Sequence, residues 1–245
     1  MNRSYIIFRI TAIIIPLCFF SGCESLFDSG SEEKTREISL DDFNTARIYT
    51  MCNLILVQDT VNYLVLSGEE KNINSVETSI EKDTLIIKDK SKFRLFNKTG
   101  RPTIYMHFKK IRSLWVHEPA DISNLDTIRL DVFSVFPIGE IGEVDLTVDC
   151  EIFVMHCSAN TLGYLHVKGK AGLCQFFNRY GCTFFADSLH AKNAEIINES
   201  IGDVFINASE KLSVYLWGNG NIYYYGSPEI EIKEKRGAGE VISIH

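Results

Sequence analysis

The chain beyond residue 36 is dominated by two-residue alternation of apolar and polar side chains, the spacing that predicts β-strands. Segments with this alternation are 47–50, 54–57, 63–66, 76–80, 84–87 and 103–108. The polar stretch Gln58-Asp59-Thr60 lies between the second and third of them and predicts a β-hairpin. No window of 12 or more residues keeps a helical apolar stripe, although Ile73, Val76 and Ile80 would support a short helical turn. We therefore expect an essentially all-β domain.

A second pattern recurs at regular intervals through the C-terminal half. It consists of triplets in which a small or turn-tolerant residue is followed by a polar and then an apolar residue. The triplets are Ala120-Asp121-Ile122, Gly139-Glu140-Ile141, Asn160-Thr161-Leu162, Cys182-Thr183-Phe184, Gly202-Asp203-Val204, Gly220-Asn221-Ile222 and Gly239-Glu240-Val241. The interval between successive first members is always about 20 residues, the length of one unit in a repeat architecture. In a β-solenoid, each coil passes a tight corner and then returns an apolar side chain to the interior, which requires this residue order.

These two patterns together predict an N-terminal strand layer that leads into a right-handed β-solenoid of about seven coils. Successive coils would lie about 4.8 Å apart. A conventional β-sandwich whose turns happen to fall at similar intervals is the alternative. The solenoid is favoured because the same residue order recurs at the same phase.

The N-terminus has the composition of an export signal. Arg3 and Arg9 precede an apolar run at residues 10–20. The 11 residues of this run are about half of the ~20 needed to span a bilayer. The run ends in Phe20-Ser21-Gly22-Cys23, which resembles the lipobox of bacterial lipoproteins, although Phe20 stands where Leu is usual. We expect residues 1–22 to be a lipoprotein signal peptide and Cys23 to be lipidated. The alternative is an ordinary cleaved signal with a coincidental cysteine.

Residues 23–36 are rich in Ser and Glu and poor in large apolar groups, which predicts an acidic tether. An acyl chain on Cys23, worth about 0.8 kcal/mol per buried methylene, would attach the protein to the lipid bilayer without a spanning helix. The acidic residues also resemble the surface-export signals of some Gram-negative lipoproteins, although a plain linker would look the same. Residues 37–245 then form a single all-β domain, and we expect an outer membrane lipoprotein of a Gram-negative bacterium, with surface exposure left open.

Composition and charge exclude two classes of protein. With 45% hydrophobic residues and only 5 Pro against 16 Gly, the chain can bury a sizeable core, so most of it is not disordered. Its formal charge is −7, and without residues 1–22 it carries 23 Lys and Arg against 32 Asp and Glu, which gives −9. Nucleic acid is therefore not an expected partner.

The C-terminal coils resemble a known family. The stretches 217–228 (WGNGNIYYYGSP) and 236–241 (RGAGEV) are similar to the closing coils of the head GIN domain of auto-transporter adhesins, whose hallmark is a repeated Gly-x-Gly-Asp/Asn-apolar turn and a terminal aromatic-Gly-x-Pro. The likeness extends over most of residues 40–245. It implies a β-solenoid with an adhesin-like or surface-structural role, and it implies no catalytic residue and no cofactor. The earlier coils depart from the pattern, because Ala120, Asn160 and Cys182 replace the glycine.

Three sets of side chains are candidates for chemistry or binding. Paired carboxylates of a glycosidase or lyase could come from Glu118, Asp121, Glu143, Asp145 and Asp149. A ridge of exposed rings for a glycan or a surface protein could come from Trp217, Tyr223, Tyr224 and Tyr225, although alternation must turn one or two of the tyrosines inward. The cysteines after Cys23 are Cys52, Cys150, Cys157, Cys174 and Cys182. Their number is odd and no two form a C-x-x-C pair, so we expect no metal site. Their disulfide pairing stays open.

We expect a non-enzymatic envelope lipoprotein that presents a β-solenoid surface for adhesion or for binding a ligand or partner. The acidic turns are explained more simply by solvation than by catalysis. A carbohydrate-active enzyme that uses carboxylates on a solenoid face is the alternative function. The ligand, the membrane leaflet and the oligomeric state are not determined by the residue pattern.

Overall fold

A computed structural model describes residues 33–90, 100–139, 141–158 and 161–244, which belong to one compact unit. The predicted signal peptide, Cys23 and residues 24–32 of the predicted tether lie outside the described residues. Glu140 and Asn160, members of two of the triplets, also lie outside them.

The described residues form strands almost throughout, with one short helix among them. The N-terminal elements are β1 (Glu33–Ser39), β2 (Thr45–Tyr49), β3 (Cys52–Gln58), β4 (Tyr63–Glu69), α1 (Glu70–Ser75), β5 (Val76–Glu81), β6 (Thr84–Asp89), β7 (Thr103–Phe108), β8 (Ser113–Val116) and β9 (Ala120–Asn124). The C-terminal elements are β10 (Ile128–Pro137), β11 (Ile141–Cys157), β12 (Leu162–Asn178), β13 (Gly181–Asn198), β14 (Val204–Leu216), β15 (Ile222–Tyr225), β16 (Glu229–Lys235) and β17 (Val241–Ser243).

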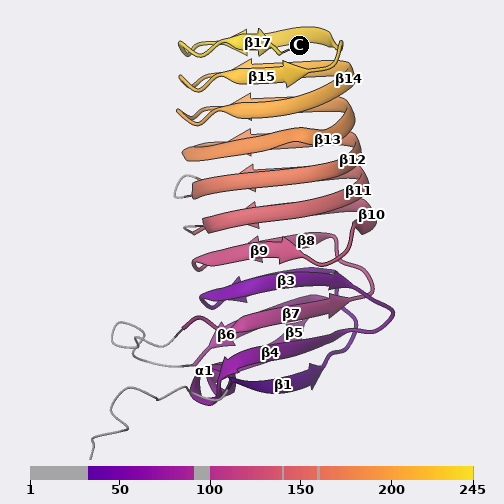
Figure 1. The fold of residues 1–245 in the computed structure, drawn as a ribbon, viewed down its shortest axis with the longest axis vertical. Coiled ribbons are helices and arrows are strands. Elements are labelled where there is room, and N and C mark those ends of the chain that lie inside the picture. Colours follow the sequence, from indigo (N-terminus) through magenta and orange to yellow (C-terminus); the bar gives the residue numbers. More distant parts are fainter. Residues whose placement is uncertain (1–32, 91–99, 140, 159–160, 245) are drawn as a thin grey trace, which may run out of the picture. The chain divides into compact units, whose positions relative to one another are not determined.

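The C-terminal half is a β-solenoid of about six turns, close to the predicted seven coils. Its strands lie one above another in Figure 1, and each is parallel to its neighbours. Strands β11 to β14 are long because each bends and contributes to two walls. We call the wall made by their first halves, with β9, β15 and β17, the first wall. The second wall contains β8, β10, the second halves of β11 to β14, and β16.

Inward-facing apolar residues stack in register along each wall. On the first wall the stacked residues are Ile122, Val144, Leu165, Phe184, Val204, Ile222 and Val241. On the second wall they are Leu114, Val135, Met155, Phe176, Ile196 and Val214. Ile232 lies opposite Val214 in the last coil, where it is 51% exposed. Rings from the two walls meet in the core, where the centroids of Phe176 and Phe184 lie 4.1 Å apart. This buried apolar stack is the main source of stability, at about 25 cal/mol per Å² of apolar surface.

Five of the seven predicted triplets fall in this register, and two do not. The residue of β11 that stacks on Ile122 is Val144 rather than Ile141, and the residue of β12 in the same column is Leu165 rather than Leu162. The side chain of Leu162 is 45% exposed. The reason is a register shift between Ile141 and Val144, where β11 has one residue more than its partner strand, as in a β-bulge.

The polar member of a triplet bonds to the next coil. Oδ1 of Asp203 accepts a hydrogen bond from the backbone N–H of Asn221 at 2.7 Å, and Oδ1 of Asn221 accepts one from the N–H of Glu240 at 2.9 Å. The small member leaves room for this close approach, because a Cβ on Gly220 would lie 2.0 Å from the carbonyl oxygen of Gly202. The triplet pattern therefore follows from how one coil contacts the next.

The N-terminal strand layer continues the same stack. Strand β3 pairs in parallel with β9 on one side and β7 on the other, and β2 pairs in parallel with β8 and β6. The antiparallel strands β4 and β1 then follow β7, and β5 follows β6. Helix α1 buries Ile73, one residue of the predicted helical turn, whereas Val76 and Ile80 belong to β5.

Two expectations for this layer were wrong. The segments 54–57 and 63–66 do not form a hairpin, because β7 lies between β3 and β4. Residues 33–36, which were assigned to the tether, instead belong to β1, where Arg36 lies opposite Leu66 of β4. The guanidinium of Arg36 also donates hydrogen bonds to the carbonyl oxygens of Ile73 and Val76, which explains how a polar segment is held in the sheet.

Candidate functional site

The first wall carries a column of stacked rings on its outer surface. His166, Phe185, Phe205 and Tyr223 each follow an inward-facing residue by one position, so alternation turns them outward and the register aligns them. Successive ring centroids lie 4.7, 5.1 and 4.8 Å apart, with interplanar angles of 6°, 9° and 13°. We call these four residues the first aromatic column.

The second wall carries a comparable column, made of Trp115, Phe136, His156 and Phe177. The rings of Trp115 and Phe136 stack at 4.1 Å, and His156 lies 6.0 Å from Phe136 and 5.1 Å from Phe177. Burial between the flanking rings lowers the pKa of His156, and the nearby charge of Arg179 lowers it further. His156 is therefore neutral at pH 7, as an uncharged member of an apolar column. We call this set the second aromatic column.

The columns limit what can bind to them. Their rings stack on one another along the coil axis, so the ring faces are largely occupied and mainly ring edges are directed outward. A sugar that needs an open ring face would find few in the middle of a column. The columns therefore offer apolar contact to a ligand, and their stacked rings stabilise each wall by joining neighbouring coils.

The four aromatic residues proposed from the sequence do not form one ridge. Tyr223 belongs to the first aromatic column, whereas Tyr224 packs against the core and Tyr225 lies opposite Asn207 of β14. Trp217 follows β14 on the second wall. Its Nε1–H donates to Oε2 of Glu234 at 2.9 Å, and the guanidinium carbon of Arg236 lies 5.2 Å from its ring centroid. Both contacts hold Trp217 in place.

Three of the five candidate carboxylates come together. Asp121, Glu143 and Asp145 line a depression of about 230 Å³ on the first wall. Each has a neighbour: Asp121 accepts the backbone N–H of Glu143, Asp145 pairs with Lys168 at 3.2 Å, and Oε1 of Glu143 lies 4.0 Å from Nε2 of His166. Glu118 lies in the turn between β8 and β9, and Asp149 lies at the bend of β11.

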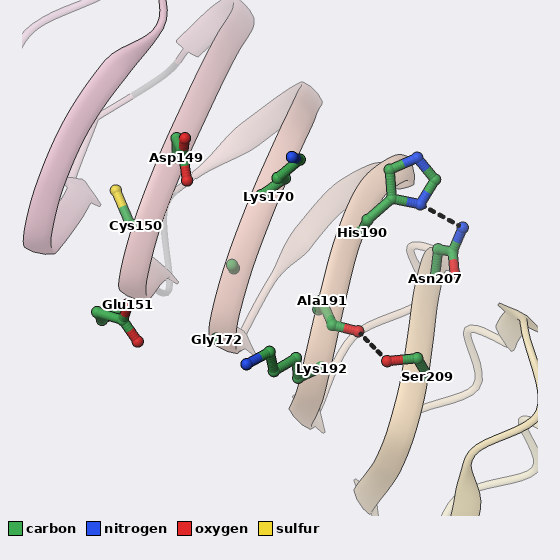
Figure 2. Close-up of a pocket in the computed structure, with 11 residues that line it drawn as sticks. Asp149, Cys150, Glu151, Lys170, Gly172, His190, Ala191, Lys192, Asn207 and Ser209 are labelled. Carbon is green, nitrogen blue, oxygen red and sulfur yellow. Dashed lines mark hydrogen bonds between the residues drawn. The ribbon is translucent and has the colours of Figure 1, made fainter.

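A groove crosses four coils at the bend between the two walls (Figure 2). We call it the corner groove. Its volume is about 410 Å³, and three steps of about 4.8 Å give it a length of about 14 Å. Its floor is formed by the small residues Cys150, Ala171 and Ala191, which lie opposite one another in register. Small side chains at the bend leave this space open.

Polar side chains form both sides of the corner groove. One side consists of Asp149, Lys170, His190 and Asn207, and the other of Glu151, Gly172, Lys192 and Ser209 (Figure 2). The Nδ1 of His190 lies 3.3 Å from Nδ2 of Asn207, and the Ser209 hydroxyl donates to the carbonyl oxygen of Ala191.

Four charges in the corner groove have no ion-pair partner among the described residues: Asp149, Glu151, Lys170 and Lys192. All four side chains are exposed. At Gly172 the second side has a gap, and a Cβ there would lie 2.7 Å from the carbonyl oxygen of Glu151. The corner groove thus presents donors, acceptors and both signs of charge along an extended, open path.

The described cysteines are core residues rather than reactive ones. All five are free and buried. Burial raises the pKa of Cys150 to about 11 and that of Cys174 to about 12, and burial with the adjacent Cys182 side chain holds the pKa of Cys157 well above its usual range. Thiols with such values stay protonated and are poor nucleophiles. The described residues contain no group of three or more His, Cys, Asp or Glu arranged to hold a metal ion.

The fold and its surface define a β-solenoid with open grooves and outward aromatic columns. Residues 42–228 match the family described as putative auto-transporter adhesin, head GIN domain. Since the match covers most of the chain, the chain belongs to this family. No curated protein matches it. Within the described residues, no helix has the length and apolar character to cross a membrane.

Solved structures with the same fold come from species of Bacteroides and Parabacteroides. A putative adhesin from Bacteroides fragilis is 20% identical, with a TM-score of 0.78 over 87% of this chain and 97% of that chain. A putative lipid binding protein from Parabacteroides distasonis is also 20% identical, with a TM-score of 0.62 over 89% and 98%. A putative adhesin from the same species is 15% identical, with a TM-score of 0.62 over 88% and 98%. At these identities the likeness shows the fold alone.

Sequence reasoning missed the columns and the corner groove. The first aromatic column was readable, because Phe185, Phe205 and Tyr223 each come directly after the apolar member of a triplet. The corner groove had a weaker signal, namely small residues such as Ala171 and Ala191 that recur once per coil next to a lysine.

Proposed function

We propose that this protein is a non-enzymatic lipoprotein of the Gram-negative cell envelope, and that its solenoid surface binds an extended polar ligand at the corner groove. Family membership supports an adhesin-like role. The lipobox-like sequence before Cys23 and the acidic residues after it support an anchor in the outer membrane and exposure at the cell surface.

The corner groove is the observation that carries the binding function. Its unpaired Lys170 and Lys192 can donate to acidic or hydroxyl groups, and Asp149 and Glu151 can accept from hydroxyl or amide groups. The alanine floor admits the apolar edge of a chain. An oligosaccharide fits these requirements best, because it combines many hydroxyl groups with apolar C–H surfaces.

A glycan array with the soluble chain, residues 24–245, tests this function. We expect binding that is weakened about tenfold or more by Lys170→Gln combined with Lys192→Gln, which removes two charge-assisted donors. Lys71→Gln combined with Lys235→Gln is the matched control, because both are exposed lysines outside the corner groove. Equal binding by the Lys170/Lys192 variant, or no binding to any glycan, would contradict the proposal.

The envelope location needs a separate test on cells. Cys23→Ala should release the protein from the membrane fraction, and mass spectrometry of the wild-type N-terminus should find an acylated Cys23. Protease treatment of intact cells should cleave the surface-exposed protein. Full protection of the protein in intact cells, with cleavage after lysis, would rule out an adhesin at the cell surface.

The grouping of Asp121, Glu143 and Asp145 favours one second candidate, a carbohydrate-active enzyme. An enzyme of this kind would release reducing ends from a bound glycan, and Glu143→Gln would abolish the release. The partners of Asp121 and Asp145 argue against this reading, because a catalytic carboxylate must be available to its substrate.

A further inference from the structure

A second groove lies on the outer surface of the N-terminal strand layer. It has a volume of about 480 Å³ and runs over β2, β6 and the turn between β5 and β6. Its lining includes Arg47, Tyr49, Glu81, Lys82, Ile86 and Lys88. We call it the basic groove.

Strand alternation explains why these side chains gather. Ile48 of β2 and Ile87 of β6 are fully buried, so their neighbours Arg47, Ile86 and Lys88 point outward. The register places Arg47 opposite Ile86, and Tyr49 opposite Lys88.

The hairpin turn brings in a further cation. Lys82 and Asp83 have φ angles of 47° and 62°, the left-handed conformation that a tight two-residue β-hairpin requires. This turn fixes Lys82 at the end of the groove, beside Glu81.

The basic groove carries an excess of positive charge in an acidic protein. It is lined by three cations, Arg47, Lys82 and Lys88, and by one carboxylate, Glu81. None of the three cations has an ion-pair partner among the described residues.

Three other cations of the same region are paired. Lys34 pairs with Glu70, Lys90 with Glu77, and Lys109 with Asp42. The whole chain has a formal charge of −7, so a groove with a net positive charge is a local exception.

Arg47 is the best-placed of the three cations. Its guanidinium carbon lies 5.4 Å from the centroid of the Trp115 ring, a cation–π contact that restrains the side chain. A guanidinium stacked in this way keeps the donors on its edge for a bidentate anion. Its charge is also felt by its neighbours, because burial and then Arg47 lower the pKa of His117.

We propose that the basic groove is a binding site for a phosphate-bearing ligand. Three cations and one carboxylate leave two positive charges, which one phosphate monoester dianion or two phosphodiester anions would balance. Arg47 recognises planar arrays of oxygen atoms, and Lys82 and Lys88 supply mobile ammonium groups. The apolar side chain of Ile86 would contact the part of the ligand next to the phosphate.

The phosphate could belong to a lipid headgroup or to a soluble molecule. Strands β5 and β6 lie at the same end of the stack as β1, where the described chain begins (Figure 1). Nine residues, 24–32, separate Cys23 from β1 and span at most about 30 Å. If Cys23 is acylated, as the proposed function holds, this short tether keeps the basic groove near the bilayer surface. The assignment to a lipid rests on that proposed function, whereas the phosphate site itself does not.

The experiment uses residues 24–245 without the acyl group. Binding of inorganic phosphate and pyrophosphate is measured by calorimetry, and binding to vesicles of phosphatidylglycerol or phosphatidylcholine by co-sedimentation. The test variant is Lys82→Gln combined with Lys88→Gln. Lys71→Gln combined with Lys235→Gln removes the same charge at exposed positions outside both grooves and is the matched control. Circular dichroism verifies that both variants are folded.

We expect the Lys82/Lys88 variant to bind about 30-fold more weakly, at about 1 kcal/mol for each lysine lost, and the control to bind like the wild type. Raising the salt concentration should weaken binding in the wild type. Binding of phosphate without vesicle binding identifies a soluble ligand. Binding to phosphatidylglycerol vesicles that is lost in the Lys82/Lys88 variant identifies a lipid headgroup.

The proposal is overturned if the wild type binds none of these probes, or if the two double variants lose binding equally. Neither result touches the glycan or cell-surface tests of the proposed function. Failure of those tests would in turn leave the phosphate measurements unchanged.

Discussion

Gly220→Ala is the substitution that tests the contact between coils most sharply. A methyl group on Gly220 would lie 2.0 Å from the carbonyl oxygen of Gly202 in the coil below and 2.6 Å from its carbonyl carbon. Both neighbours are backbone atoms, so no side chain can rotate out of the way. The two coils must therefore separate by about 1 Å or more to restore ordinary contact.

The cost can be worked out from the bonds at this corner. The N–H of Gly220 donates to the carbonyl oxygen of Ser200 at 2.9 Å, and its carbonyl oxygen accepts from Nδ2 of Asn198 at 3.3 Å. Losing both costs about 1 kcal/mol each, and overpacking adds about 1 kcal/mol or more, so we expect a destabilisation of about 3 kcal/mol. For a domain of this size, that corresponds to a fall in Tm of about 6–12 °C.

The assay combines thermal unfolding with the fluorescence of Trp217, which lies next to this corner. Because a solenoid is stabilised by contacts between neighbouring coils, β15 to β17 should detach before the rest unfolds, and amide exchange should be fastest there. Gly100→Ala is the control, because a Cβ at Gly100 has nothing within 4 Å. A Tm for Gly220→Ala within about 1 °C of the control would refute the reasoning, since the expected fall is several times larger.

Further predictions concern the hydrogen bond from Asn221 to Asp203 and two titrating groups. Asp203→Ala removes the acceptor for the N–H of Asn221 and should lower the free energy of unfolding by about 1 kcal/mol in denaturant titrations, whereas the exposed control Asp131→Ala should change it little. Because burial lowers the pKa of His156, the unfolded chain binds the proton first and stability should fall as pH drops below about 6.5; His156→Phe should reduce this fall in Tm measured between pH 8 and pH 5. Hydrogen bonds from the backbone N–H of Thr60 and then from His107 lower the pKa of Asp59, so Asp59→Asn should destabilise the protein at pH 7 and make less difference near pH 3. An equal Tm difference at both pH values would show that the carboxylate charge contributes nothing.

The solenoid was predictable because its physical requirements act locally. A corner needs a small residue where two backbones approach, such as Gly220, and a side-chain acceptor for the next coil, such as Asp203. An apolar residue must then return to the core, as Val204 does. These three needs occupy consecutive positions, so they recur in the sequence with the period of the coil.

Pairing and register were less predictable because they depend on distant partners. Strand β7 separates β3 from β4, although the residues of all three alternate in the same way and nothing local distinguishes the neighbours. In β11 both Ile141 and Val144 are apolar and buried, so the sequence alone does not say which one stacks on Ile122. One extra residue in β11 sets the register that places Val144 opposite Ile122.

The candidate sites were the least predictable part. Alternation implied that one or two of the three consecutive tyrosines would point inward, and Tyr224 packs against the core, although the sequence did not say which of them would do so. The two grooves depend on which charged residues lack partners, for example Lys88 beside the paired Lys90. Pairing of surface charges is set by side-chain geometry across strands, and the sequence pattern does not contain it.

Cross-linking of Gln175→Cys with Glu195→Cys tests the stacked coils most directly. These two residues lie opposite each other in neighbouring coils, with Nε2 of Gln175 2.6 Å from Oε2 of Glu195, and adjacent strands are about 4.8 Å apart, within the range that a disulfide spans. We predict rapid oxidation of this pair in the folded protein. The pair Gln175→Cys and Ser213→Cys, two coils apart on the same outer column, should not close. Failure of the first pair in a folded protein, or closure of both at the same rate, would contradict a chain wound as a stack of coils in this register.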